Sequence, residues 1–204
     1  MEAGLAKFDD IAEVRRLIEE ISKGTVLGRV LGQGAAIAGR ALGVSRVPAI
    51  LGQGVSAYDP RAIKGNGVTY LTSPQGADHT AGNTIRIKVE HADPQGKALL
   101  SRNAQIGAAA IDSTGICLFA GGPINANLNL VYDLLAAKYG EEVPQDYWTK
   151  LGSAVLRDEL AFNEAAGVPP LESRMPEFFY KEPLAPTDAV FDVPLDEIKE
   201  VVRF

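Results

Sequence analysis

The sequence has very little cysteine and histidine. It contains one cysteine, Cys117, and two histidines, His79 and His91, in 204 residues. A lone cysteine excludes an internal disulfide, which agrees with a reducing compartment. A zinc site or an iron–sulfur cluster needs three or four protein ligands, so Cys117 can supply only one of them.

An excess of basic residues and a long apolar run are also missing. Lys and Arg number 20 against 26 Asp and Glu, the net charge is −6, and the basic residues are scattered. This pattern argues against a nucleic-acid partner. The longest apolar runs, such as 134–137, fall far below the roughly 20 residues that span a bilayer, and the start lacks the build of a signal peptide. We therefore expect a cytoplasmic protein that does not bind membranes.

Apolar residues make up 46% of the chain, enough for one large domain or two small ones that share an interface. Apolar residues at helical spacing predict a helix over 11–21, with Asp9 or Asp10 as a possible N-cap and Gly24 as its end. The next helical stretch, 25–42, contains four glycines, which weaken the helical pattern and indicate close helix packing. Further helical stretches are 97–110, 128–139 and 144–166, and a brief helix is expected over 194–201.

Residues 44–73 are rich in Gly, Pro and Tyr and predict extended chain and turns, with one short helix capped by Asp59 and beginning at Pro60. This loop-rich region continues through 73–80. After Gly167, six prolines forbid long helices and predict an extended tail. Five or six helices and no set of alternating strands indicate an all-α, multihelical fold with loop-rich segments and an extended C-terminal tail.

One glycine pattern imitates a dinucleotide site. Residues 47–51 read as a strand, residues 52–57 match G-x-G-x-x-A, and Asp78 follows about twenty residues later. Dinucleotide binding requires a helix that begins within the glycines and runs on, so that its N-terminus faces the pyrophosphate. Asp59 and Pro60 interrupt such a helix within one turn, so we reject this interpretation.

Three groups of polar residues have two interpretations each. His79, in a small polar loop, is a candidate for proton transfer, although a surface histidine is the commoner outcome; His91 is a weaker candidate. Tyr58, Asp59 and Arg61 could bring a phenol, a carboxylate and a guanidinium together. We favour the plain interpretation, a helix N-cap with Arg61 solvated or paired.

The segment 112–117 combines a carboxylate, a glycine and the only thiol. Asp112 at a helix end can accept two N–H donors from a planar heterocycle, and Gly115 lets the backbone bend past it. Cys117 can ligate a metal as a thiolate. The alternative is a buried, inert thiol between Ile116 and Leu118, and the residues alone favour it, because free cysteines are commonly buried.

Over essentially its whole length, the chain resembles the C-terminal portion of the aldehyde ferredoxin oxidoreductase family, whose members hold tungsten or molybdenum on pterins. Several separated motifs carry the resemblance, and their order and spacing make chance similarity unlikely. They are Ala57-Tyr58-Asp59-Pro60-Arg61, Gly65-x-Gly67-Val68-Thr69-Tyr70, Thr72-Ser73-Pro74-x-Gly76-Ala77-Asp78-His79 and Asp112-x-x-Gly115-Ile116-Cys117-Leu118-Phe119.

The resemblance implies a mostly α-helical fold and an oxidoreductase that converts aldehydes to carboxylic acids and passes electrons to ferredoxin. Its cofactors would be a tungsten or molybdenum bis-pterin and a 4Fe-4S cluster. By resemblance, Asp112 hydrogen-bonds one pterin, Gly115 and Ile116 adjoin it, and Cys117 is the fourth cluster ligand. His79 aligns with a histidine near the metal that is proposed to assist proton transfer.

Family members also carry an N-terminal pterin-binding domain, a Cys-x-x-Cys-x-x-x-Cys set and an earlier Asp-x-x-Gly copy, which residues 1–204 do not contain. Residues 1–5 resemble the end of the helix after that earlier copy. We therefore expect residues 1–204 to form the family's C-terminal helical region, as one unit or two intertwined subdomains, inactive alone and binding no cofactor by itself. Its partners would be that N-terminal domain, ferredoxin and the aldehyde, and an uncovered apolar face would favour a homo-oligomer. The rival hypothesis is a non-catalytic binding or assembly subunit that docks onto an N-terminal partner or a pterin carrier.

Overall fold

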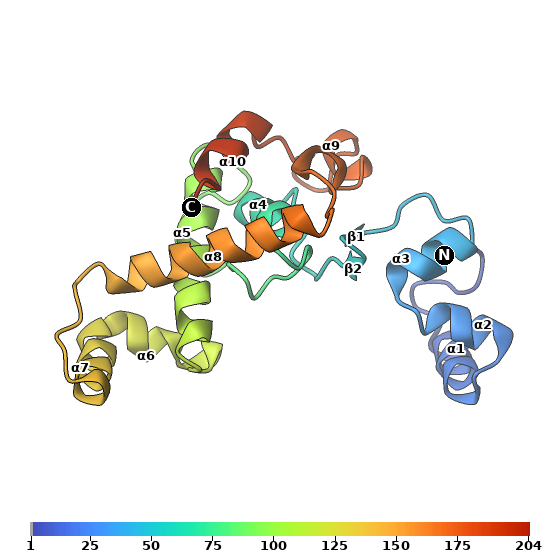
Figure 1. The fold of residues 1–204 in the computed structure, drawn as a ribbon. Helices are drawn as coiled ribbons and strands as arrows, with labels where there is room; N and C mark the ends of the chain where they lie inside the picture. Colours follow the sequence, from blue (N-terminus) through green and yellow to red (C-terminus); the bar gives the residue numbers. More distant parts are fainter. Residues whose placement is uncertain (1) are drawn as a thin grey trace.

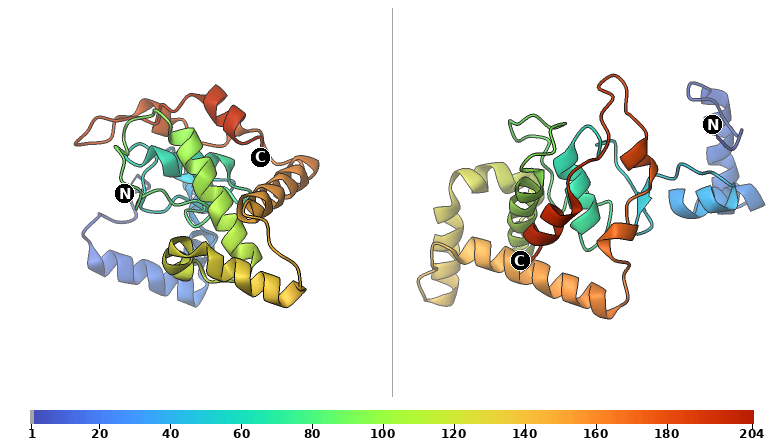
Figure 2. Two further views of the ribbon diagram at one scale, coloured as in Figure 1. Left: turned by 90° about the vertical axis from the view of Figure 1, so that its left-hand side faces the viewer. Right: turned by 90° about the horizontal axis from the view of Figure 1, so that it is seen from above.

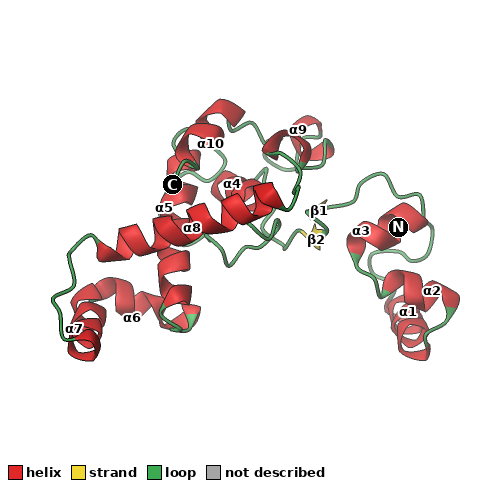
Figure 3. Cartoon of the chain, in the orientation of Figure 1, coloured by secondary structure: helices red, strands yellow, loops and turns green. Residues whose placement is uncertain are grey.

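The computed structural model describes residues 2–204. Within this range the chain is almost entirely helix and loop, with one short hairpin (Figure 3), so the predicted all-α fold is confirmed. The elements are α1 (Ile11–Lys23), α2 (Val26–Leu31), α3 (Ala35–Ala41), β1 (Ala49–Ile50), β2 (Gln53–Gly54), α4 (Lys64–Thr72), α5 (Lys97–Ser113), the 3-10 helix η1 (Leu118–Ala120), α6 (Gly121–Ala126), α7 (Leu128–Tyr139), α8 (Tyr147–Ala165), the 3-10 helix η2 (Leu171–Ser173), α9 (Phe178–Lys181) and α10 (Leu195–Val201).

Helices α1, α2 and α3 lie together at one end of the molecule, beyond the hairpin from the other helices (Figures 1 and 2). The prediction for α1 is confirmed at both ends. The Asp10 carboxylate accepts a hydrogen bond from the Glu13 N–H at 3.0 Å, and Gly24 ends the helix in the left-handed conformation at φ 64°. No residue of α1 is buried, so the apolar side of this helix is largely exposed to solvent.

The glycines of residues 25–42 split the second predicted helix into α2 and α3 and bring the chain close to its neighbours. A Cβ atom on Gly28 would lie 1.9 Å from the carbonyl oxygen of Glu20 in α1. On Gly39 it would lie 2.3 Å from the Val47 side chain. The predicted close packing is therefore confirmed, and any larger residue at Gly28 would push α2 away from α1.

The hairpin occupies the place of the dinucleotide-like pattern. β1 and β2 pair antiparallel, with Ala49 opposite Gly54 and Ile50 opposite Gln53. Leu51 and Gly52 make the turn with positive φ angles of 52° and 84°. These glycines therefore serve a strand reversal, and no helix begins within them.

All nine residues of α4 are buried. We predicted a helix capped by Asp59 that begins at Pro60, and this prediction is wrong. The Asp59 carbonyl accepts hydrogen bonds from Ala62 and Ile63, and its carboxylate accepts one from the Arg61 N–H, which closes a single turn. The helix begins only afterwards, at Lys64.

Two apolar cores pack against α5, one near its start and one near its end. The first surrounds α4 and includes Ala98 of α5; the second lies where the end of α5 meets α7 and the start of α8. Ala98 and Ala110 are twelve residues apart, which corresponds to about 18 Å along a helix axis. The first core contains Ile50, Val68, Tyr70, Leu71, Ala77, Ala98, Met175, Phe179, Phe191, Val193 and Ile198, and the second contains Ala110, Ile111, Val131, Tyr132 and Trp148.

Helix α8 crosses α5 at very close range (Figure 1). A Cβ atom on Gly152 would lie 2.1 Å from the carbonyl oxygen of Ile106, so only glycine allows this approach. The predicted helix over 144–166 is confirmed, with Gly167 in the left-handed conformation just beyond it. Leu156 of this helix is buried, whereas the Phe162 side chain is 72% exposed.

The C-terminal tail returns over the first core, and its predicted brief helix is confirmed as α10. The Phe191 N–H donates to the Phe179 carbonyl at 2.8 Å, and the Phe191 ring fills the space left by Gly67. At the other end of the chain, residues 2–5 form turns and bends rather than the helix end expected for residues 1–5, of which Met1 lies outside the described residues.

Candidate functional site

The segment from Asp112 to Cys117 is a tight reversal at the end of α5. The Gly115 N–H donates to the Asp112 carbonyl at 3.0 Å, and Gly115 adopts the left-handed conformation at φ 71°. Cys117 directly precedes η1, and its carbonyl accepts the Ala120 N–H at 2.8 Å. Because a Cβ atom on Gly115 would have no heavy atom within 4 Å, its positive φ and not crowding accounts for the glycine.

Ile116 anchors this reversal, since it packs against the second core. The residues on either side of it point elsewhere: Asp112 and Cys117 are both exposed. The alternative of a buried, inert thiol is therefore wrong for Cys117. The arrangement presents a carboxylate and a thiol to the outside of the same short turn.

A second carboxylate lies within electrostatic reach of Asp112. Partial desolvation raises the pKa of Glu159 in α8, and the negative charge of Asp112 raises it further. Nothing in the sequence indicated this pair, because the crossing of α5 and α8 that creates it joins residues 47 positions apart.

His79 lies on the loop between α4 and α5, half-buried, with its ring against that of Tyr58. The ring centroids are 5.4 Å apart and the planes are inclined by 46°. Next to it, the Asp78 carboxylate accepts hydrogen bonds from the N–H and the hydroxyl of Thr80 at 2.8 and 2.7 Å. This turn fixes the backbone directly around His79.

Tyr58 is itself held in place by Tyr70. The Tyr70 hydroxyl donates to the Tyr58 carbonyl at 3.1 Å and lies 2.9 Å from the Ser56 hydroxyl. Burial raises the pKa of Tyr70, so its hydroxyl stays protonated and remains a donor. The sequence had drawn attention to Tyr58 only as a neighbour of Asp59, and no pattern linked it to a histidine 21 residues later.

Arg61 is paired, as the plain interpretation of its motif predicted. Its Nη2 lies 2.7 Å from the Asp59 carboxylate, its Nη1 donates to the Glu182 carbonyl at 2.9 Å, and its guanidinium lies 5.5 Å from the Phe179 ring centroid. Asp59 holds the pKa of Arg61 above its usual value. Both charges are thus committed to joining the loop to α9, and neither is available to a substrate.

The structure brings Asp112, Gly115, Ile116 and Cys117 together and places His79 on a separate loop. The link between them is α5: a Cβ atom on Gly82, three residues after His79, would lie 2.6 Å from the Gln105 side chain. Asp112 follows Gln105 by seven residues, or about 10 Å along the helix. The assignments of these residues to a cofactor site stay predictions.

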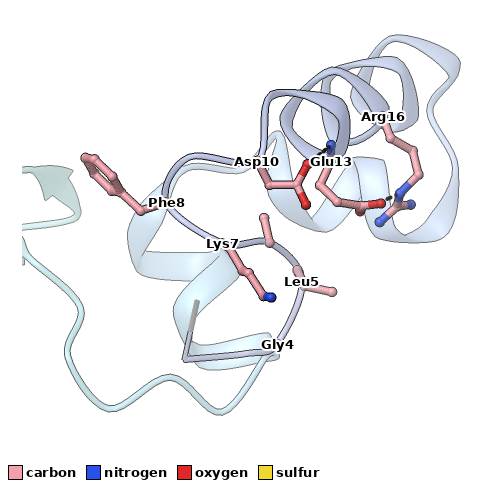
Figure 4. A pocket seen from close by; sticks show the side chains of 8 residues that line it. Gly4, Leu5, Lys7, Phe8, Asp10, Glu13 and Arg16 are labelled. Atoms are coloured by element: carbon pink, nitrogen blue, oxygen red, sulfur yellow. Dashed lines mark hydrogen bonds and ion pairs between the residues drawn. The ribbon is translucent and has the colours of Figure 1, made fainter.

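An open hollow on the surface lies far along the chain from these residues, beside the start of α1 (Figure 4). Asp10, Glu13 and Arg16 line it, and the Arg16 Nε donates to the Glu13 carboxylate at 2.9 Å. These side chains cap and brace α1, so the hollow adds no catalytic group.

Among residues 2–204, no three His, Cys, Asp or Glu side chains converge on a position that could hold a metal ion. No single helix in this range is long and apolar enough to cross a membrane; one pair bent by 114°, Lys97–Ser113 and Leu118–Ile124, meets that requirement by length and composition only.

Comparison with known proteins gives consistent matches. The family model described as aldehyde ferredoxin oxidoreductase, domains 2 and 3, matches residues 2–203. The tungsten-containing aldehyde ferredoxin oxidoreductase of Pyrococcus horikoshii is 27% identical over 188 residues, which cover 87% of this chain and 31% of that protein. The enzyme of the same description from Pyrococcus furiosus is 30% identical over 137 residues, 63% of this chain and 22% of that protein. The matched region thus spans 31% and 22% of the length of these two relatives, and the chain belongs to the aldehyde ferredoxin oxidoreductase family, whose domains 2 and 3 it matches.

Proposed function

We propose that this chain is the C-terminal part of an oxidoreductase that oxidises aldehydes to carboxylic acids with ferredoxin as the electron acceptor. In this proposal the chain supplies contacts to a pterin cofactor and to an iron–sulfur cluster and is inactive by itself. The observation that carries the proposal is the turn at the end of α5, where Ile116 is anchored and Asp112 and Cys117 are both exposed.

The residues of this turn fit the proposed cofactors in their chemistry. An ionised carboxylate only accepts hydrogen bonds, so Asp112 suits the N–H groups of a pterin. A thiolate is a soft ligand that suits iron, so Cys117 would be the fourth ligand of a 4Fe-4S cluster. The open space beside Gly115 leaves room for a flat ring next to the backbone.

When bound, a tungsten or molybdenum bis-pterin would supply two-electron redox chemistry, and the cluster would carry the electrons towards ferredoxin. Oxidation of an aldehyde with water to a carboxylic acid releases two protons besides two electrons. His79 is the residue we propose for proton transfer, because an imidazole exchanges protons near neutral pH. The Tyr58 ring restricts the orientation of that imidazole.

The remaining ligands would come from the N-terminal domain of the complete enzyme, which we propose as the partner of this chain. Cys117 is the single cysteine available here. The exposed apolar residues of α1 support a partner at that end, because apolar side chains gathered on one helix gain stability when covered. They are Ile11, Val14, Ile18 and Ile21. A cytoplasmic location is part of the same proposal and agrees with the lone thiol.

The test is co-expression of the chain with the N-terminal domain of a relative. We expect the purified chain alone to contain no stoichiometric iron or tungsten, and the complex to contain both and to oxidise aldehydes. Cys117→Ser should remove the cluster, and Asp112→Asn should lower the bound pterin. Ser113→Ala, on the exposed surface of the same turn, is the matched control.

A tight four-iron cluster in the chain alone would contradict the proposal. So would a complex that keeps its iron after Cys117→Ser. A stable complex that binds pterin but neither iron nor aldehyde would instead favour the assembly subunit. Self-association of the chain alone is expected from the exposed face of α1, and a monomer by size-exclusion chromatography would count against that expectation.

A further inference from the structure

The loop that carries His79 is held by side chains from the C-terminal third of the chain. Asn163, in the last turn of α8, donates from Nδ2 to the Pro74 carbonyl at 2.8 Å. Arg174, just after η2, donates from Nη1 to the Leu71 carbonyl at 2.7 Å. Both acceptors are backbone carbonyls at the point where α4 ends and the loop begins.

The contact at Leu71 satisfies a carbonyl that α4 itself leaves free, whereas Pro74 lies just beyond the end of α4. The last carbonyls of a helix have no partner within it, and a cation is favourable at that end. Arg174 meets both needs at Leu71, and its Nε is fixed at the same time by the Pro169 carbonyl at 2.8 Å. Arg174 is half-buried, and this burial lowers its pKa.

From Pro74 to His79 the loop has little freedom. Gly76 has φ 86°, and a Cβ atom there would lie 2.3 Å from the Ile50 carbonyl, so the loop lies directly against the hairpin. The Asp78 carboxylate closes the turn onto Thr80. A displacement at Leu71 or Pro74 would therefore be passed along the loop and not absorbed within it.

We propose that Asn163 and Arg174 are positioning residues for His79: they fix where the loop leaves α4 and thereby hold the imidazole against Tyr58. The inference rests on the proposed role of His79 in proton transfer. Neither residue touches the His79 ring, so each acts through the loop backbone.

The chain offers a direct measurement, because it has only two histidines, His79 and His91. Its NMR spectrum contains one Hε1 resonance from each, and His79→Gln assigns them. The Tyr58 ring lies close enough to the His79 ring to shift its resonance, so this shift reports the distance between the two rings. His91, twelve residues further along the same connection between α4 and α5, serves as the internal reference, because its carbonyl is held separately by the Lys64 N–H at 3.2 Å.

Three variants test the contacts in the 204-residue chain. Asn163→Asp keeps the size of the side chain and removes its N–H donors, Asn163→Ala removes the group, and Arg174→Gln removes the guanidinium. We expect all three to move the His79 resonance towards its position in the urea-unfolded chain and to leave His91 in place. Asn129→Ala, on the exposed surface of α7, is the matched control and should move neither resonance.

An unchanged His79 resonance in a folded variant overturns the role of the residue that was changed. Loss of both folded resonances in every variant also overturns the proposal, because the contacts would then be needed for folding rather than for placing the loop. The spectrum needs no cofactor. If the variants behave as expected but the assembled complex oxidises no aldehyde, the proposed function fails while the positioning stands.

Discussion

The ring of Tyr58 covers one side of His79, with the two centroids 5.4 Å apart. Removing that ring should open the imidazole to reagents. We expect Tyr58→Ala to increase the rate at which diethyl pyrocarbonate modifies His79, and Tyr58→Phe to leave the rate nearly unchanged, because phenylalanine keeps the ring. Mass spectrometry of the modified chain separates His79 from His91. Equal rates in the wild type and Tyr58→Ala would show that the contact does not shield His79.

The ion pair between the buried Lys64 and the half-exposed Asp192 ties the tail to α4. Lys64 is 3% exposed and Asp192 is 48% exposed. Asp192→Asn leaves a buried ammonium without its counter-charge, which for a fully buried pair costs about 3–5 kcal/mol. Because Asp192 is half exposed, we expect the free energy of unfolding in urea to fall by about 2 kcal/mol.

The matched control for that pair is the exposed one between Lys181 and Glu177, whose side chains are 70% and 73% exposed. Glu177→Gln should change the free energy of unfolding by less than about 1 kcal/mol. If Asp192→Asn costs no more than Glu177→Gln, the tail is not held by this ion pair.

Gly67 allows the tail to lie against α4. A Cβ atom there would lie 2.5 Å from the Phe191 ring and 2.8 Å from Pro60. We expect Gly67→Ala to lower the free energy of unfolding by about 1–3 kcal/mol, as other overpacked cores do. Gly107→Ala, in α5 with no heavy atom within 4 Å of the added Cβ, should instead gain up to about 1 kcal/mol. A Gly67 variant as stable as the Gly107 variant would contradict the close packing.

The helices that the sequence predicted best are those whose signals are local. Helix α1 is capped by the Asp10 carboxylate at its start and by the left-handed Gly24 at its end, as expected. Helix α7 likewise ends at Gly140. Helix α4 was missed because Gly65, Gly67 and Thr69 are poor helix formers. Its stability comes from burial on all sides by segments distant in sequence, including Phe191, and no local pattern reveals such contacts.

The candidate site shows the same division. Sequence motifs and family resemblance singled out Asp112, Cys117 and His79, because each lies in a recognisable short segment. Their neighbours Glu159 and Asn163 were not predictable. Both lie on α8. Glu159 comes near Asp112 only because α8 crosses α5, and Asn163 reaches the loop only because α8 ends beside Pro74.

The raised pKa of Glu159 predicts a pH dependence of stability. Burial and the charge of Asp112 raise its pKa in the folded chain above the value in the unfolded chain. Such a group favours folding below its unfolded pKa, and this contribution is lost as the pH rises through the folded pKa. Glu159→Gln cannot ionise, so it should be more stable than the wild type at neutral pH and lose that advantage in acid.

Asp112→Asn removes the charge of Asp112, which is the smaller of the two causes that raise the pKa of Glu159. It should lower the pKa of Glu159 part of the way, because burial remains. A carbon-detected NMR titration of the Glu159 carboxyl measures this directly. Asp158→Asn, exposed on the same helix, is the control, and an equal effect of both variants would show that Asp112 does not act on Glu159 specifically.

The exposure of Cys117 predicts that the folded chain reacts with thiol reagents. Dithionitrobenzoate should label one thiol per chain without denaturant, and at a rate that urea raises little, because the thiol just before η1 is already exposed. The reaction should disappear in Cys117→Ser. In the complex with an N-terminal domain, a cluster ligated by Cys117 would protect the thiol, whereas an assembly subunit without a cluster would leave it reactive unless the partner covers the turn. Chelation of iron from the complex separates these cases, since it should restore the reaction only where iron provided the protection.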